Sequence, residues 1–339
     1  MAEDLCSFHM NLFILRPPKA SPLLLRMIML VFATVCGLYI CSICLKQISS
    51  QSKSFVEVIH RSCDNYGMNP LRAPYVHYPQ PQTFGRAECE GNPVRFFVII
   101  SMQRSGSGWF ETLLNSHINL SSNGEIFSIR DRRSNISSVV RTLDRVYDLD
   151  WLSSASKNEC SAAIGFKWML NQGLMEYRKE ILDYLNRKGV HVIFLFRRNL
   201  LRRMVSELAN SYDRFAKLLN GTHKSHVHSL EEANMLSKYK PLINSTSLIS
   251  QLKQMDLLTA KALKYFHDTR HIILYYEDLV KNHTKLLDVQ DFLGLPHMKL
   301  TSRQVKIHKG PLEEHIQNWN DVSKVLNGTS YEIFLHKDY

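Results

Sequence analysis

One stretch of the chain places a cation, hydroxyls and glycines in an order suited to holding an anion. From residue 95 the sequence reads R-F-F-V-I-I-S-M-Q-R-S-G-S-G-W-F, with Arg104 before the glycines and hydroxyls at Ser105 and Ser107. Glycines let the backbone approach a ligand, and the N–H groups at a helix N-terminus add partial positive charge. The stretch therefore predicts an anion-binding loop between a strand and a helix.

The surrounding pattern supplies those two elements. Residues 96–100 form a continuous apolar run, as in a strand buried on both faces, and Trp109, Leu113 and Leu114 then follow helical spacing. Alternating strands and helices predict an α/β fold of P-loop type, in which a mostly parallel central sheet is flanked by helices in three layers. Strands are expected at 96–100, 162–169, 190–196 and 272–276, and helices at 174–187, 200–219, 248–266 and 284–293.

A second group of polar side chains follows the strand predicted at 190–196. Arg198 comes directly after this strand, and Ser206 follows eight residues later on the next helix. A guanidinium and a hydroxyl near a helix start can hold a phosphate. Lys167 lies near the end of another strand, and ligands of parallel sheets bind beyond the strand carboxyl ends. The alternative is that residues 197–203 are the solvated start of a basic helix.

Together these motifs resemble those of the sulfotransferases that use 3′-phosphoadenosine 5′-phosphosulfate (PAPS), above all the membrane-anchored Golgi and nodulation-type carbohydrate enzymes. The loop lacks the Lys-Ser/Thr of a Walker A motif, and its cation precedes the glycines as in the family's 5′-phosphosulfate loop. Gly108 departs from the family pattern, which usually has a hydroxyl residue there. The resemblance implies that PAPS is bound by Arg104, Ser105, Gly106, Ser107 and Gly108 at the phosphosulfate, by Trp109 at the adenine, and by Arg198, Ser206, Lys309 and Gly310 at the 3′-phosphate.

The same resemblance implies the catalytic residues. Glu125 follows the first helix in an Asn-Gly-Glu sequence, like the general base of tyrosylprotein sulfotransferases. A carboxylate there can take the proton of the attacking hydroxyl, and His117 is the alternative base. Arg104 and Lys167 resemble cations that neutralise charge on the transferring group. The implied reaction is sulfuryl transfer from PAPS to a carbohydrate hydroxyl, with no metal.

Net charge and the N-terminal region suggest where such an enzyme would work. The net charge of +11 suits polyanionic ligands. Residues 27–45 carry no charged side chain and approach the length of a membrane-spanning helix. A cleaved signal or a buried core helix is the alternative. We expect a single-pass type II Golgi membrane protein with a cytoplasmic tail at 1–26, a signal anchor at 27–45, a proline-rich stem at 46–93 and a lumenal sulfotransferase domain at 94–339.

Glycosylation sequons and cysteines agree with a lumenal domain. No close cysteine pair has zinc-site spacing, and Cys63–Cys89 is one candidate disulfide whose pairing the sequence does not decide. The expected partners are a glycan or glycoprotein acceptor and the membrane, without nucleic acid, and the sequence leaves the oligomeric state open. The sequons begin at Asn119, Asn135, Asn220, Asn244, Asn282 and Asn327.

Three other functions compete with this interpretation. A Golgi glycosyltransferase would share the anchor and sequons, and Asp148-Leu149-Asp150 supplies a D-x-D sequence that could hold Mn²⁺. A P-loop kinase is disfavoured because the Walker Lys-Ser/Thr is missing. A membrane-anchored, non-catalytic protein could bind polyanions through its basic surface alone. Such binding would be salt-sensitive and would survive loss of Arg104 and Glu125.

Overall fold

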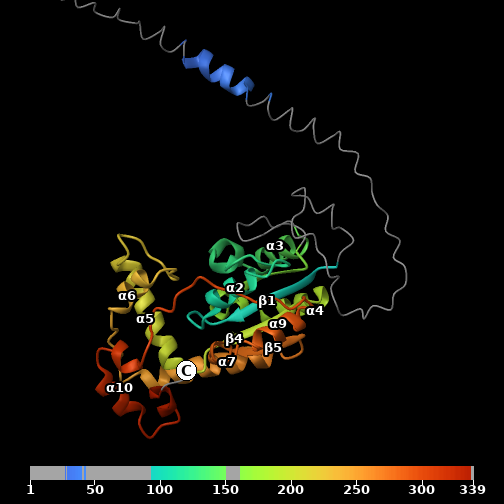
Figure 1. Cartoon of the computed structure of the whole chain (residues 1–339). Helices are drawn as coiled ribbons and strands as arrows, with labels where there is room; N and C mark the ends of the chain where they lie inside the picture. The colour runs from blue at the N-terminus through green and yellow to red at the C-terminus, as the bar shows by residue number, and fades with distance from the viewer. Residues whose placement is uncertain (1–26, 28, 40–41, 43–92, 150–160, 337–339) are drawn as a thin grey trace, which may run out of the picture. The chain divides into compact units, whose positions relative to one another are not determined.

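The computed structural model describes residues 27, 29–39, 42, 93–149 and 161–336. The chain divides into two units, residues 1–66 and 67–339. In the first, residues 29–39 are helical (Figure 1). Within the described residues, no helix is both long enough and apolar enough to cross a membrane. The predicted tail, most of the predicted stem, Cys63 and Cys89 lie outside the described residues, so these stay predictions.

A five-stranded parallel sheet forms the centre of the second unit and confirms the predicted sheet (Figure 1). Its order is β2-β3-β1-β4-β5. Ser101, the last residue of β1, pairs with Met169 of β3 and Leu195 of β4. Because these strands end in register, the segments that follow them emerge at one edge of the sheet. The strands are β1 (Arg95–Ser101), β2 (Leu120–Ser122), β3 (Ala163–Met169), β4 (His191–Phe196) and β5 (His271–Tyr275).

Helices cover both faces of this sheet, which confirms the three layers. Alternate residues of a strand face opposite sides. Phe97 and Ile99 of β1 accordingly pack with α2 (Ser107–Asn115) and α9 (Lys285–Phe292) on one face. The other face packs Val98 and Ile100 with three helices. These are α3 (Ile136–Tyr147), α4 (Arg178–Lys188) and α7 (Leu248–Tyr265).

Two predicted helices are shorter than the sequence pattern suggested. The helix predicted at 174–187 starts only at Arg178, because Gly173 adopts a φ of 80° in an irregular turn at Leu170–Leu174. The helix predicted at 200–219 is α5 (Leu200–Ala216), which ends where Lys217 turns left-handed. The remaining helices are α6 (Leu230–Ser237), α8 (Tyr276–Lys281) and α10 (Trp319–Leu326), with 3₁₀ turns at Ile126–Ser128, Arg130–Arg133, Leu312–His315 and Glu332–Leu335.

Candidate functional site

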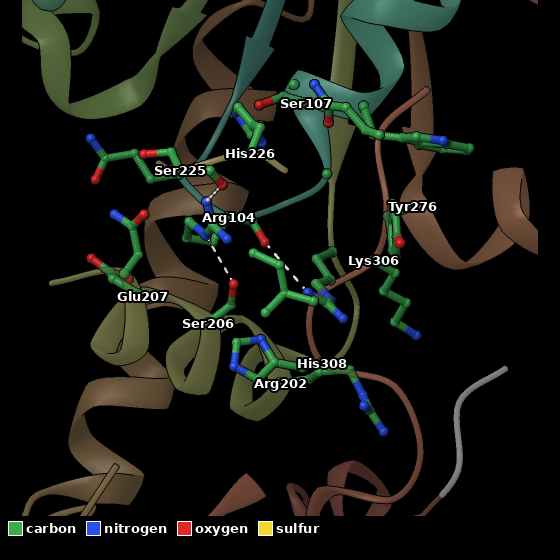
Figure 2. A pocket seen from close by; sticks show the side chains of 18 of the residues that line it. Arg104, Ser107, Arg202, Ser206, Glu207, Ser225, His226, Tyr276, Lys306 and His308 are labelled. Carbon is green, nitrogen blue, oxygen red and sulfur yellow. Dashed lines mark hydrogen bonds between the residues drawn. The ribbon is translucent and has the colours of Figure 1, made fainter. Parts of the chain in front are cut away.

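A cavity of about 320 Å³ lies at the carboxyl edge of the sheet (Figure 2). Its walls come from the loop after β1, the end of β3, the start of α5, and two irregular connections at 225–226 and 304–308. Cations outnumber carboxylates in its lining, and a cleft with an excess of one sign of charge concentrates oppositely charged ligands, so this cavity suits a polyanion. The lining cations are Arg104, Lys167, Arg197, Arg202, Arg214 and Lys306.

The loop after β1 leaves the N-terminus of α2 open toward this cavity. Gly106 has a φ of 83°, and a Cβ there would overlap the Tyr276 ring, so only glycine fits. No side chain caps α2, which leaves its first N–H groups available to an anion. Ser107 lines the cavity, whereas Ser105 is fully buried and its Oγ has no hydrogen-bond partner among the described residues.

Arg104 connects the two predicted phosphate motifs directly. Its Nε donates to Ser206 Oγ at 2.9 Å, and its Nη1 donates to the Ser225 carbonyl at 2.8 Å (Figure 2). Burial, reinforced by repulsion from Arg197, lowers the pKa of Arg104 to about 10. The guanidinium therefore stays charged at neutral pH, and Arg104 and Ser206 reach the same cavity.

Arg198 does not line the cavity. Its Nη2 lies 2.8 Å from Asp278 Oδ2, its guanidinium stacks 4.0 Å from the centre of the Tyr275 ring, and the side chain is about half exposed. Arg202 lines the cavity instead, one helical turn before Ser206 on the same face of α5. That i, i+4 spacing was the signal that could have identified Arg202 from the sequence.

The predicted Lys309 and Gly310 also lie beyond the cavity lining, which ends at His308 in this segment. The Gly310 carbonyl nevertheless accepts a hydrogen bond from Arg202 Nη1 at 3.0 Å. The C-terminal segment is thus tied to α5, and its residues 304–308 line the cavity, with Lys306 and His308 labelled in Figure 2.

Two carboxylates flank Lys167, and their surroundings differ. Lys167 Nζ lies 3.1 Å from Glu111 Oε2 and 3.9 Å from Glu125 Oε2. Glu111 is nearly buried and accepts hydrogen bonds from Ser122 Oγ at 2.6 Å and from the Gly124 N–H at 3.0 Å. Glu125 lines the cavity with 32% of its side chain exposed. Of these two carboxylates, Glu125 is therefore the one that a bound hydroxyl can reach.

The alternative base, His117, is placed away from the cavity. Its side chain is completely buried, its Nε2 lies 2.9 Å from the Pro296 carbonyl, and its Nδ1 accepts from the Asn119 N–H at 3.0 Å. His117 therefore serves the core. Asn119 is itself buried, so this sequon is inaccessible in the folded unit.

Two aromatic side chains and one histidine complete the lining. Trp109, predicted to contact the nucleotide, packs edge-on against Tyr276 with the ring centres 5.5 Å apart. His226 lies beside Ser107 in Figure 2. Desolvation, then repulsion from Arg104 and Lys167, lowers the pKa of His226 to about 4. The sequence motifs assigned neither residue to the site, because Tyr276 was predicted only as the last residue of a strand and His226 belonged to no motif.

No cluster of metal-ligating side chains occurs in the part of the chain that the structure describes. In the D-x-D sequence, Asp148 pairs with Lys188 at 2.7 Å, and Asp150 lies outside the described residues.

The chain is similar to two proteins called nodulation protein H. The one from Rhizobium meliloti is 24% identical over 238 residues, which is 68% of this chain and 90% of the relative. The one from Rhizobium tropici is 26% identical over 249 residues, covering 71% and 93%. The predicted resemblance to the sulfotransferase superfamily is confirmed. No family model matches the chain.

Solved structures align over much of the same length. Mouse sulfotransferase SULT7A1 complexed with PAP is 15% identical and covers 72% of this chain and 76% of its own, with a TM-score of 0.32. The sulfotransferase domain from the curacin biosynthetic pathway is 16% identical and covers 72% and 90%, with a TM-score of 0.31.

Proposed function

We propose that this sulfotransferase moves a sulfuryl group from PAPS to a hydroxyl of a carbohydrate acceptor, with Glu125 as general base. The observation that carries the proposal is the 2.9 Å hydrogen bond from Arg104 to Ser206. It brings the loop expected to hold the 5′-phosphosulfate next to the helix expected to hold the 3′-phosphate. A ligand that is anionic at both ends accounts for the many cations around one cavity.

In this proposal the loop after β1 binds one end of the nucleotide and α5 binds the other. Arg104, Ser107 and the N–H groups around Gly106 hold the phosphosulfate, with Ser105 behind them. Ser206 and Arg202 hold the 3′-phosphate. Arg198, predicted from the sequence for this phosphate, would reach it only after releasing Asp278.

The transfer then needs a base on one side of sulfur and cations around it. Glu125 takes the proton as the acceptor oxygen attacks sulfur. The bond between sulfur and the phosphate oxygen breaks, and adenosine 3′,5′-bisphosphate (PAP) leaves with the electron pair. Lys167 and Arg104 offset the charge on the sulfuryl oxygens and the leaving phosphate.

A carbohydrate acceptor is proposed because the two motifs resemble nodulation-type carbohydrate enzymes and because relatives named nodulation protein H align over most of their length. Membrane anchoring through 27–45 and a lumenal Golgi location remain part of the proposal, resting on the uncharged run and the sequons. Protease protection of the full chain in microsomes tests that topology.

The function itself is tested on detergent-solubilised full-length protein. We expect calorimetry to show PAP binding, and labelled PAPS to pass its sulfuryl group to a member of a glycan panel without added metal. Arg104→Ala is the matched control, in which PAP binding and sulfuryl transfer should both be strongly weakened. Transfer only to tyrosine peptides would overturn the acceptor class, and absence of PAP binding would overturn the function.

A further inference from the structure

The backbone conformation at position 108 does not require glycine. It lies in the first turn of α2, and its φ is not among the positive values that make Gly106 obligatory. Glycine is a poor helix former, and a serine or threonine here would match the resembled family pattern and supply a hydroxyl to the anion. The reason for glycine must therefore lie in a neighbouring side chain.

That neighbour is His226. A Cβ on Gly108 would overlap Cε1 and Nε2 of the His226 ring. The imidazole thus fills the space in which a side chain at position 108 would begin, beside the open N-terminus of α2. The His226 side chain, which comes from a connection far away in the sequence, therefore occupies the space that a side chain at position 108 would need.

The position of His226 is fixed from both sides. Its predecessor, Ser225, accepts a hydrogen bond from Arg104 at 2.8 Å through its carbonyl. Its successor, Val227, is completely buried and accepts a hydrogen bond from the Val305 N–H at 2.9 Å. The connection between α5 and α6 is therefore held against the loop and against the C-terminal segment, with the imidazole directed at α2.

The ring also has unused hydrogen-bonding capacity. Neither nitrogen of His226 has a hydrogen-bond partner among the described residues, and the side chain remains accessible from the cavity that it lines. The lowered pKa keeps the imidazole neutral near pH 7. A neutral imidazole carries one N–H donor and one acceptor, so it can donate to an anion as a hydroxyl does.

We propose that His226 replaces the hydroxyl missing at Gly108 and donates a ring N–H to the phosphosulfate held by the loop. His226 would thereby fix the sulfuryl end of PAPS in place. The inference rests on the proposed function, because the donor needs an anion in the loop. It adds a binding residue from a segment that belongs to neither phosphate motif.

The test is a compensating pair of substitutions in the full chain. Calorimetry at neutral pH measures PAPS and PAP affinities of His226→Ala, His226→Gln, Gly108→Ser and the double variant Gly108→Ser/His226→Ala. His228→Ala, an exposed histidine two residues away that does not line the cavity, is the matched control. Thermal unfolding of every variant reports whether a loss of affinity reflects a loss of fold.

Losing a hydrogen bond to a charged group predicts PAPS binding weakened about tenfold or more in His226→Ala. His226→Gln should retain most of the affinity because its amide N–H can donate. Gly108→Ser alone should lower the melting temperature and weaken PAPS binding, since serine and the imidazole compete for space. The double variant should regain both, because the hydroxyl then stands where the ring was. His228→Ala should match the wild type.

Two results overturn the proposal separately from the proposed function. If the wild type binds PAPS and His226→Ala binds it as tightly as His228→Ala does, His226 is only a packing residue. If the double variant binds no better than His226→Ala, the hydroxyl and the imidazole are not equivalent. A wild type that binds neither PAPS nor PAP would remove the proposed function, and the role of His226 with it.

Discussion

The cavity has two walls of different origin. The strand-end wall comprises residues 103–104, residues 106–109, Glu125, Lys167, Arg197, Arg202 and Ser206, which lie at or after the ends of β1 to β4 or on α5. The connection wall comprises residues 225–226 and 304–308, from segments without regular structure. The first is placed by the register of parallel strands. The second is placed by single contacts, such as those to the Ser225 carbonyl and Val227.

The difference shows how the chemistry is divided between the walls. Strands fix the loop and the candidate base rigidly, as a transferring group requires. The connection wall encloses the cavity from the other side and carries two histidines of lowered pKa, His226 and His308. If this division is correct, substitutions in the strand-end wall should give the largest effects on the reaction.

The largest expected effect is on turnover in Glu125→Gln. Removing a general base lowers kcat by roughly a hundredfold to ten-thousandfold, and PAP affinity should change little because the proposed base acts on the acceptor hydroxyl and not on the nucleotide. Glu111→Gln is the matched control on the other side of Lys167. It should lower the melting temperature more than it lowers kcat, because Glu111 is locked by Ser122 and Gly124. A larger kcat loss in Glu111→Gln would reverse the assignment of the base.

Arg104→Ala should come next, because Arg104 contacts both walls. Losing a charge-assisted contact to phosphate should weaken PAP binding about a hundredfold, measured by calorimetry. Removing its bond to Ser225 should also free the connection wall, so amide exchange around Val227 should accelerate. Arg104→Lys should keep part of the affinity. If PAP binding weakens but amide exchange around Val227 does not accelerate, the position of the connection wall does not depend on Arg104.

A smaller effect distinguishes the two candidate arginines for the 3′-phosphate. Arg202→Ala should weaken PAP binding about tenfold, whereas Arg198→Ala should change it by less than about threefold. The reason is position: Arg202 lines the cavity and Arg198 pairs with Asp278. Calorimetry of both variants under one salt condition provides the comparison. The reverse ranking would mean that Arg198 leaves Asp278 when the nucleotide binds.

The sequence predicted most of the strand-end wall, though not Arg197 or Arg202, because its signals are local. Buried strands read as continuous apolar runs, and parallel strands bring their ends together, so Arg104, Lys167 and Ser206 could be placed before any coordinates. Arg198 was harder, because adjacent arginines after a strand point in different directions and Asp278 lies far along the chain. His226 had no local signal, since its position depends on Val305 and on the absence of a side chain at Gly108.

The smallest expected effect concerns the connection wall and pH. His308 is buried, and its Nε2 has no hydrogen-bond partner within the described residues. Burial, then repulsion from His315 and Arg104, lowers the pKa of His308 to about 3. Unfolding returns this pKa to about 6.5, so below that pH the unfolded state binds the extra proton. The free energy of unfolding should therefore be highest above about pH 6.5 and should decrease as the pH falls toward 3.

His308→Asn should flatten this decline without abolishing it, because the pKa values of His226 and His191 are also lowered, each to about 4. Denaturant unfolding of wild type and variant at neutral and mildly acidic pH measures the difference. His267→Asn, at an exposed histidine remote from the cavity lining, serves as the control and should leave the decline unchanged. An identical decline in wild type and His308→Asn would show that folding does not lower the pKa of His308. The ring would then gain its proton in the folded state near the pKa of free histidine, and the connection wall would present one more cation to the nucleotide in mildly acidic solution.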